Sequence, residues 1–195
     1  WDAYRRDCWG QDELRPVSQS CSSEFGGLGV QIIDALDSLW LLGLEDDYLE
    51  AEAWVLQNFT LDVDISVSVF ETTIRILGGL LSAYFLSGKA DLLALSEDLG
   101  RRLLRAWRSG PVPYELVNLR TGAVSARESH LGSSLAEVGT LQVEFEALSS
   151  FTGDEYFSCR GQHVMELLGS LLHEHGGLLP IMLHPALPLK WTNPR

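Results

Sequence analysis

One glutamate and one arginine interrupt an otherwise apolar stretch at residues 67–81. Valine, phenylalanine, isoleucine and leucine surround Glu71 and Arg75, and their spacing predicts a helix. The two charges are four residues apart, so they share one face of that helix and can form an ion pair. Burying a charge among apolar side chains costs free energy unless the charge is paired. The pair is therefore either a surface bridge or the wall of a polar site, and spacing alone favours the surface bridge.

Further carboxylates occur at helical spacing. Glu137 and Glu144 are two helical turns apart and lie on nearly the same face of a predicted helix. Such a pair usually marks a solvated face, but the flanking leucine, valine and phenylalanine residues indicate a polar seam on a buried helix. Asp34 and Asp37, three residues apart, are either polar groups between packed helices or pocket carboxylates, and the sequence leaves both interpretations open.

Short, distinctive segments lie along most of the chain. They are residues 9–16 (WGQDELRP), 33–40 (IDALDSLW), 67–81 (VSVFETTIRILGGLL), 86–88 (LSG), 113–114 (PY), 117–122 (VNLRTG) and 135–145 (LAEVGTLQVEF). In this order and at this spacing they resemble the class I α1,2-mannosidases, glycoside hydrolase family 47, from residue 1 to about residue 180. One matching hexamer would carry little weight, whereas several collinear matches carry much.

The resemblance implies roles for individual residues. Glycosidic hydrolysis generally uses two carboxyl groups, one to protonate the leaving oxygen and one to activate water or attack. By resemblance, Glu71 is the catalytic general acid of an inverting enzyme, Arg75 contacts the active-site pocket, and Glu137 contacts the substrate. An apolar-walled pocket disfavours an ionised carboxyl group, and the neighbouring guanidinium opposes that effect.

The N-terminal matching block implies further substrate-binding residues, and it also departs from the family. Asp12, Glu13 and Arg15 occupy positions that line the pocket rim in the family. Gln11 stands where relatives usually have histidine. Residues 125–131 also differ from the family in the loop that shapes how a branched glycan enters, so the preferred mannose branch does not follow from this chain.

Helical periodicity dominates the sequence. Helices are predicted at residues 1–10, 28–43, 46–58, 66–87, 89–106, 133–152 and 154–174. Their short connections indicate antiparallel helical hairpins. Two segments differ: residues 110–132 read as a long loop facing the substrate, and residues 176–195 as one arm of a β-hairpin followed by a broken second arm.

For the fold, the resemblance implies an all-α α/α toroid, a barrel of seven inner and seven outer helices. The family's second essential carboxylate and the C-terminal threonine that anchors its calcium fall beyond residue 195. We therefore expect residues 1–195 to form part of one catalytic domain, roughly the first half of the barrel, and to be inactive alone. An open half-barrel should leave inner-helix residues such as Leu77, Leu80 and Leu81 partly exposed. Ca²⁺ is the expected cofactor by resemblance, with no metal ligand among these residues.

Composition narrows the partners. The chain carries 27 acidic and 14 basic residues, a net charge of −13, which disfavours nucleic acid or an anionic membrane as a partner. No run of about eighteen apolar residues is present, so no membrane segment is expected. A neutral oligomannose N-glycan on a glycoprotein is compatible with this balance.

Cysteine and histidine indicate no metal centre. Cys8, Cys21 and Cys159 show no paired-ligand spacing, and idle thiols are favoured over a disulfide, of which at most one is possible. The five histidines also lack ligand spacing. Asn58 begins the one N-glycosylation sequon and is the expected glycan attachment site.

Function follows from the resemblance as an expectation. The favoured function is a mannosyl-oligosaccharide α1,2-mannosidase that trims terminal mannose from N-glycans in the lumen of the secretory pathway, in the ER or Golgi, or outside the cell. The alternative is a non-catalytic mannosidase-like protein that binds oligomannose glycans in ER-associated degradation; a helical scaffold without a sugar site is the third. Some aromatic residues could stack on sugar rings but are more simply explained as core: Trp40, Trp107, Tyr114 and Trp191.

Overall fold

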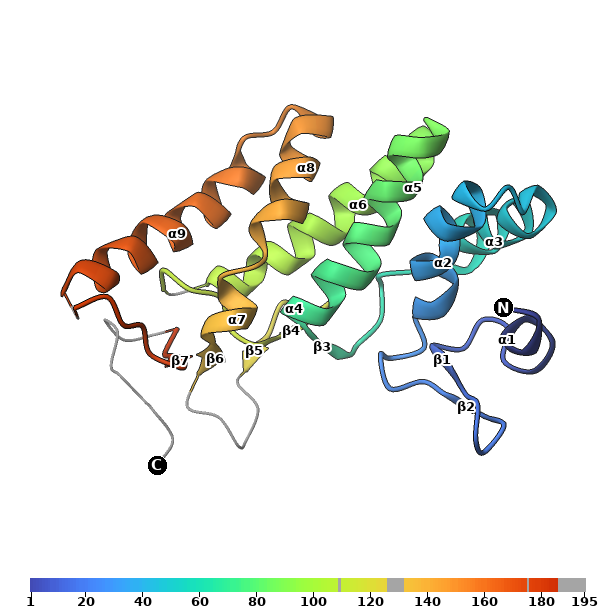
Figure 1. The fold of residues 1–195 in the computed structure, drawn as a ribbon, viewed down its shortest axis with the longest axis horizontal. Helices are drawn as coiled ribbons and strands as arrows, with labels where there is room; N and C mark the ends of the chain where they lie inside the picture. The colour runs from blue at the N-terminus through green and yellow to red at the C-terminus, as the bar shows by residue number, and fades with distance from the viewer. Residues whose placement is uncertain (109, 126–131, 175, 186–195) are drawn as a thin grey trace.

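The computed structural model describes residues 1–108, 110–125, 132–174 and 176–185. Helices make up most of this part of the chain. They are α1 (Asp2–Asp7), α2 (Val30–Leu41), α3 (Glu45–Asn58), α4 (Val69–Thr72), the π-helical turn η1 (Thr73–Leu77), α5 (Gly78–Ser87), α6 (Ala90–Leu103), the 3-10 turn η2 (Leu104–Trp107), α7 (Leu135–Val138), α8 (Gln142–Thr152) and α9 (Tyr156–Glu174). The longer ones form three helical hairpins, α2–α3, α5–α6 and α8–α9, which stand in a row in sequence order (Figure 1).

Apolar residues at helical spacing hold the hairpins together. On α2, Ile32, Ile33 and Leu36 are fully buried, and this face packs against α5. Gly79 allows that contact, because a Cβ atom there would lie 2.8 Å from the carbonyl oxygen of Ile33. A single hydrophobic core runs through the described part of the chain, from Tyr4 to Leu183.

Short strands gather at one end of the helices (Figure 1). All of their pairings are antiparallel. The pairs are β1 (Glu13–Arg15) with β2 (Ser20–Ser22), β4 (Leu116–Asn118) with both β3 (Ser66–Ser68) and β5 (Val124–Ser125), and β6 (Ser133–Ser134) with β7 (Met182–Leu183). Figure 1 also shows that α2, α4 and α7 begin at this strand end, so residues in their first turns lie near it.

The predicted helical hairpins are confirmed, but several predicted segments were wrong in detail. The predicted helix 66–87 begins as strand β3, and the predicted helix 133–152 begins as β6 and is interrupted after α7 at Gly139. The predicted loop 110–132 contains β4 and β5; its residues 126–131 lie outside the described residues. The C-terminal strand β7 pairs with the distant β6 instead of a local hairpin partner, and residues 186–195 are not described.

The expected exposure of the inner-helix leucines was also wrong. Leu77 and Leu80 are fully buried and Leu81 nearly so, because neighbouring hairpins of this chain cover them. The exposed apolar side chains lie elsewhere: Leu41 and Leu42 at the α2–α3 turn are 71% and 73% exposed.

The preference for idle thiols was wrong for two of the cysteines. Cys8 and Cys21 form a disulfide that joins the end of α1 to strand β2. Cys159 on α9 is exposed and free. Cys8 and Cys21 are thirteen residues apart in the sequence. Their spacing alone does not show which of the three cysteines are joined.

One continuous helix in the described residues, Val69–Ser87, is long and apolar enough to cross a membrane by composition. Its mean hydropathy is 1.3, and half of this window is buried inside the structure. Core helices pass the same test, so this is a weak indication of a membrane span.

Candidate active site

Glu71 is held at the strand end of the structure by a short capped helix. Strand β3 runs directly into α4, and the hydroxyl of Ser68 accepts a hydrogen bond from the Glu71 N–H at 3.3 Å. The helix then passes through the π-helical turn η1, which carries Arg75, before α5 begins. Turns of this kind are frequent at functional sites.

Arg75 bridges two carboxylates. Its Nε donates to Oε2 of Glu71 at 2.8 Å, and its NH1 lies 3.7 Å from Oδ2 of Asp34 on α2. The hydrogen bond to Glu71 is the main reason that the pKa of Arg75 is raised above its usual range. Burial raises the pKa of Asp34, and the charge on Arg75 opposes this rise. The predicted ion pair is therefore formed, and it extends to a second helix.

Two cavities of about 360 Å³ each adjoin at Arg75. Glu71 lines one of them together with Glu24, Phe25, Ser66, Val67, Ser68 and Leu116. Asp34 lines the other together with Asp12, Glu13, Leu14, Val30, Gln31 and Ala35. Each volume lies within the range of small-ligand sites. Glu71 and Arg75 thus form an ion pair whose side chains are 31% and 39% exposed, and this pair also lines a cavity.

The three rim residues of the N-terminal block differ in their positions. Asp12 is completely buried, and its two oxygens accept the N–H groups of Gly27 and Gly29 at 2.8 and 2.9 Å, so it fixes the start of α2. Glu13 lines the cavity beside Asp34 and helps to raise the pKa of Arg75. Arg15 pairs with Glu24 and lines neither cavity. A substrate contact by each of the three stays a prediction.

The structure separates the two aspartates that the sequence left undecided. Asp34 faces a cavity and Arg75, as described above. Asp37 accepts a hydrogen bond from the hydroxyl of Ser82 on α5 at 2.8 Å. Asp37 is therefore a polar link between packed helices, and Asp34 is the pocket carboxylate.

Glu137 occupies a position like that of Glu71 on another short helix. Ser134 of β6 caps α7: its hydroxyl accepts the Glu137 N–H at 3.2 Å, and Oε2 of Glu137 accepts the Ser134 N–H at 2.9 Å. A cavity of only about 10 Å³ lies between α7 and α4, lined by Glu137 and Phe70 among others. Glu137 is thus close to α4 but does not line the two larger cavities.

Both short helices carry a sequence signal that could have located them. Ser68 and Ser134 are each followed three residues later by glutamate, the pattern of a capping box at a helix start. The box is complete at Ser134, whereas the carboxylate of Glu71 bonds to Arg75. Because the Glu71 carboxylate bonds to Arg75 and does not complete the capping box, it faces a cavity.

Glu144 does not reach either large cavity. It lies on α8 against the first turn of α5, where a Cβ atom added to Gly78 would be 3.7 Å from its Cγ. Its buried Oε2 has no hydrogen-bond partner among the described residues. Loss of solvent raises the pKa of this carboxyl group.

The aromatic candidates differ in their surroundings. Trp40 is 42% exposed and lies edge-on to Tyr48, and Trp107 is nearly buried against Phe145. Tyr114 lines the small cavity beside Glu137. Trp191 lies outside the described residues.

Metal and glycan sites were also expected by resemblance. No group of three or more histidine, cysteine, aspartate or glutamate side chains lies together in the described part of the chain. Asn58 is exposed at the last residue of α3, and its side chain donates to the carbonyl of Trp54 at 3.0 Å. Glycosylation at Asn58 stays a prediction.

Known proteins match nearly the whole length of this chain. The family model described as glycosyl hydrolase family 47 matches residues 1–192. The endoplasmic reticulum mannosyl-oligosaccharide 1,2-alpha-mannosidase of Homo sapiens is 44% identical over 94% of this chain and 26% of its own length. The mannosyl-oligosaccharide 1,2-alpha-mannosidase MNS1 of Arabidopsis thaliana is 41% identical over 95% of this chain and 33% of its length.

A solved structure agrees with the sequence comparisons. The alpha-1,2-mannosidase from Trichoderma reesei superposes with a TM-score of 0.77 at 31% identity, covering 86% of this chain and 38% of that one. The α/α toroid expected from the resemblance is the fold of this relative. The chain belongs to glycosyl hydrolase family 47. It spans about a quarter to a third of the length of the curated relatives it matches.

Proposed function

We propose that the protein containing this chain is a mannosyl-oligosaccharide α1,2-mannosidase, which hydrolyses terminal α1,2-linked mannose from N-glycans with inversion. The observation that carries this proposal is the position of Glu71. It is a carboxyl group fixed by a capped helix at a cavity of about 360 Å³ and hydrogen-bonded to Arg75. The names of the relatives support the substrate class.

In the proposed reaction Glu71 gives its proton to the oxygen of the leaving sugar. Arg75 already donates to Oε2 of Glu71, so its positive charge would stabilise the carboxylate that remains after transfer. Inversion also needs a base and a water on the opposite face of the sugar, with the two carboxyl groups about 6.5–9.5 Å apart. We assign that base to a part of the enzyme beyond residue 195.

Calcium belongs to the proposal only through the resemblance. When bound in a glycosidase pocket, such an ion supplies a positive charge that holds sugar hydroxyls and water in place. By the resemblance, we place its ligands in a part of the protein other than the described residues of this chain. In this proposal the described residues bind and orient the sugar, and Glu71 protonates the leaving oxygen.

The test of this function is the variant Glu71→Gln in the intact enzyme. Glutamine keeps the shape of the side chain but has no proton to transfer, so kcat should fall by about two to four orders of magnitude. Release of mannose from an oligomannose N-glycan, followed by mass spectrometry, measures it. Glu146→Gln on the exposed face of α8 is the matched control and should keep full activity.

Two outcomes would contradict the proposal. Near-normal turnover by Glu71→Gln would remove Glu71 from the role of proton donor. An intact wild-type protein that binds the glycan but releases no mannose would favour the non-catalytic oligomannose-binding alternative.

We also propose that the protein acts in the lumen of the secretory pathway. The Cys8–Cys21 disulfide supports this, because such bonds persist in oxidising compartments, and one relative is named for the endoplasmic reticulum. Exposed Asn58 should then carry a glycan. Expression in a secretory host should give a band that glycosidase treatment shifts and that Asn58→Gln abolishes; an unshifted wild-type band would count against this site.

A further inference from the structure

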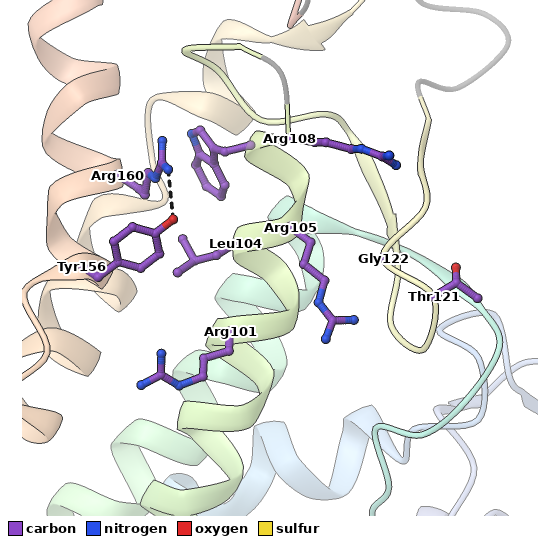
Figure 2. Close-up of a pocket in the computed structure, with 9 residues that line it drawn as sticks. Arg101, Leu104, Arg105, Arg108, Thr121, Gly122, Tyr156 and Arg160 are labelled. Carbon is purple, nitrogen blue, oxygen red and sulfur yellow. Dashed lines mark hydrogen bonds between the residues drawn. The ribbon is translucent and has the colours of Figure 1, made fainter.

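Another cavity, basic in character, lies away from Glu71. It has a volume of about 580 Å³ and is lined by Arg101, Leu104, Arg105, Trp107, Arg108, Thr121, Gly122, Tyr156 and Arg160. Arg101 lies on α6, Leu104, Arg105 and Trp107 form part of η2, and Arg108 follows it. Thr121 and Gly122 belong to the β4–β5 connection, and Tyr156 and Arg160 to α9 (Figure 2). None of these residues lines either cavity beside Arg75.

The charge of this cavity is opposite to that of the chain. Four of the 14 basic residues line it, in a chain with a net charge of −13. The residues described as its lining include no carboxylate. Positive charges gathered in a concave site attract anionic ligands. This holds even though the whole chain is negative, because salt screens charges that lie more than about 8–10 Å away.

Arg105 is held in place without being neutralised. A Cβ atom at Gly122 would lie 2.8 Å from Cδ of Arg105, so the missing side chain leaves room for the arginine's stem. Its NH1 donates to the carbonyl oxygen of Arg120 at 3.3 Å. No carboxylate of the described residues forms an ion pair with Arg105.

Arg160 is fixed in the same manner from the opposite wall. Its NH2 donates to the hydroxyl of Tyr156 at 2.9 Å, and its guanidinium lies 5.2 Å from the centre of the Tyr156 ring (Figure 2). Both partners are neutral. By contrast, Arg101 is bonded to Glu97 and Asp154, so a large part of its charge is already compensated.

Trp107 gives a second, independent indication of a ligand. This side chain is 6% exposed, and its indole N–H has no hydrogen-bond acceptor in the described part of the chain. A buried donor without an acceptor costs about 1–3 kcal/mol. Trp107 lines both this cavity and an adjoining one of about 430 Å³ that Arg160 also shares. An acceptor atom supplied by a ligand would relieve this cost.

We propose that this cavity binds an anionic sugar, a saccharide that carries a phosphate or sulfate ester. The ester oxygens can accept charge-assisted hydrogen bonds from the guanidinium fork of Arg160, which binds tetrahedral oxyanions well. The guanidinium of Arg105 points toward the Thr121–Gly122 turn (Figure 2) and adds positive charge to the same cavity. Leu104, Trp107 and Tyr156 provide apolar and aromatic surface for the ring of the sugar. The volume accommodates a small glycan.

Calorimetric titration of the intact protein tests this proposal with four probes: a hexose 6-phosphate, the corresponding 6-sulfate, inorganic phosphate and the neutral hexose. We expect an ester to bind, the neutral hexose not to bind, and the affinity to fall as salt is raised. The stronger of the two esters identifies the source of the oxyanion. The double variant Arg105→Gln with Arg160→Gln should weaken ester binding at least tenfold.

Matched controls separate this site from general charge effects. Arg5→Gln with Arg6→Gln changes the net charge equally on exposed α1 and should leave ester binding unchanged. Circular dichroism checks that each variant is folded, and Tyr156→Phe, which removes only the hydroxyl that holds Arg160, should weaken binding by a smaller factor. These results together would support the proposal.

Other results would overturn it. No ester binding at millimolar concentration, or ester binding unaffected by the double variant, would remove the site. Equal affinity for inorganic phosphate and the esters would remove the sugar from the proposal. Displacement of the ester by an acidic peptide that binds more tightly would assign the cavity to a polypeptide segment instead.

Discussion

Glu144 is a carboxyl group that the fold shields from solvent, and none of the described residues donates a hydrogen bond to its Oε2. Its Oε2 is buried, and desolvation raises its pKa above the ordinary value of 4.5. The folded protein therefore keeps this proton to a higher pH than the unfolded chain does. Between the ordinary and the raised pKa the free energy of unfolding falls as pH rises, and above both values the full penalty is present.

We predict that Glu144→Gln reduces this penalty. The melting temperature of the variant should match that of the wild type at a pH below 4.5 and exceed it by at most a few degrees at neutral pH. Melting curves recorded across this range measure the difference. Glu146→Gln, exposed on the same helix, should show no such pH dependence. A Glu144→Gln variant that is less stable at neutral pH would mean that an unseen donor stabilises the carboxylate.

Chemistry at the residue level could be assigned only partly from the sequence. The spacing of Glu71 and Arg75 allowed their pairing, and the resemblance supplied the role of Glu71. Spacing did not reveal that Asp34 is the second carboxylate beside Arg75, because this contact depends on how α2 packs against the following helices. The buried, backbone-bonded state of Asp12 was hidden for the same reason: its N–H partners lie fifteen and seventeen residues away.

Contact between α2 and α5 determines where Asp34 meets Arg75. The helices approach closely at Gly79, since an added Cβ would lie 2.8 Å from the backbone oxygen of Ile33, which cannot easily move. We predict that Gly79→Ala lowers the free energy of unfolding by about 1–3 kcal/mol, the usual cost of overpacking. Activity of the intact enzyme should also fall, because the two helices would be pushed apart.

Gly169 provides the control for this prediction. It lies inside helix α9, and an added Cβ would meet nothing within 4 Å. Gly169→Ala should therefore raise stability by about 0.5–1 kcal/mol through helix propensity. Chemical denaturation of both variants measures the two effects. Equal changes in the two variants would show that the α2–α5 contact can adjust.

Elements of different length differed in how far they could be predicted. The helices α2, α3, α6 and α9 have twelve or more residues, repeat their apolar pattern several times and were located correctly within a few residues. Strands of two or three residues show no pattern, and β6 pairs with β7 across α7, α8 and α9. The π-helical turn at Arg75 likewise has no sequence signature.

The molecule places its candidate catalytic carboxylates at helix starts on one side. Helices α2, α4 and α7 begin at the strand end, and Asp34, Glu71 and Glu137 lie in or near their first turns (Figure 1). The positive end of a helix dipole favours a nearby negative charge. In the proposed reaction this arrangement would stabilise the carboxylate left on Glu71 after proton transfer. The opposite ends of the helices, with exposed Leu41 and Leu42, lie outside the site.

We predict that the 195-residue chain by itself does not release mannose. Inversion requires a base about 6.5–9.5 Å from the acid with a water between them. Asp34 lines the neighbouring cavity and faces Arg75, and Glu137 has one oxygen bonded to the Ser134 N–H and lines neither large cavity. Neither is therefore free to act as the partner of Glu71.

Incubation of the purified chain with calcium and an oligomannose N-glycan, followed by mass spectrometry, tests this prediction. The intact enzyme under the same conditions is the positive control. Mannose release by the chain alone that disappears in Glu71→Gln would show that the base lies within these residues. Asp34→Asn and Glu137→Gln, tested one at a time, would then identify it, because only loss of the base should abolish turnover while Glu71 and Arg75 stay in place.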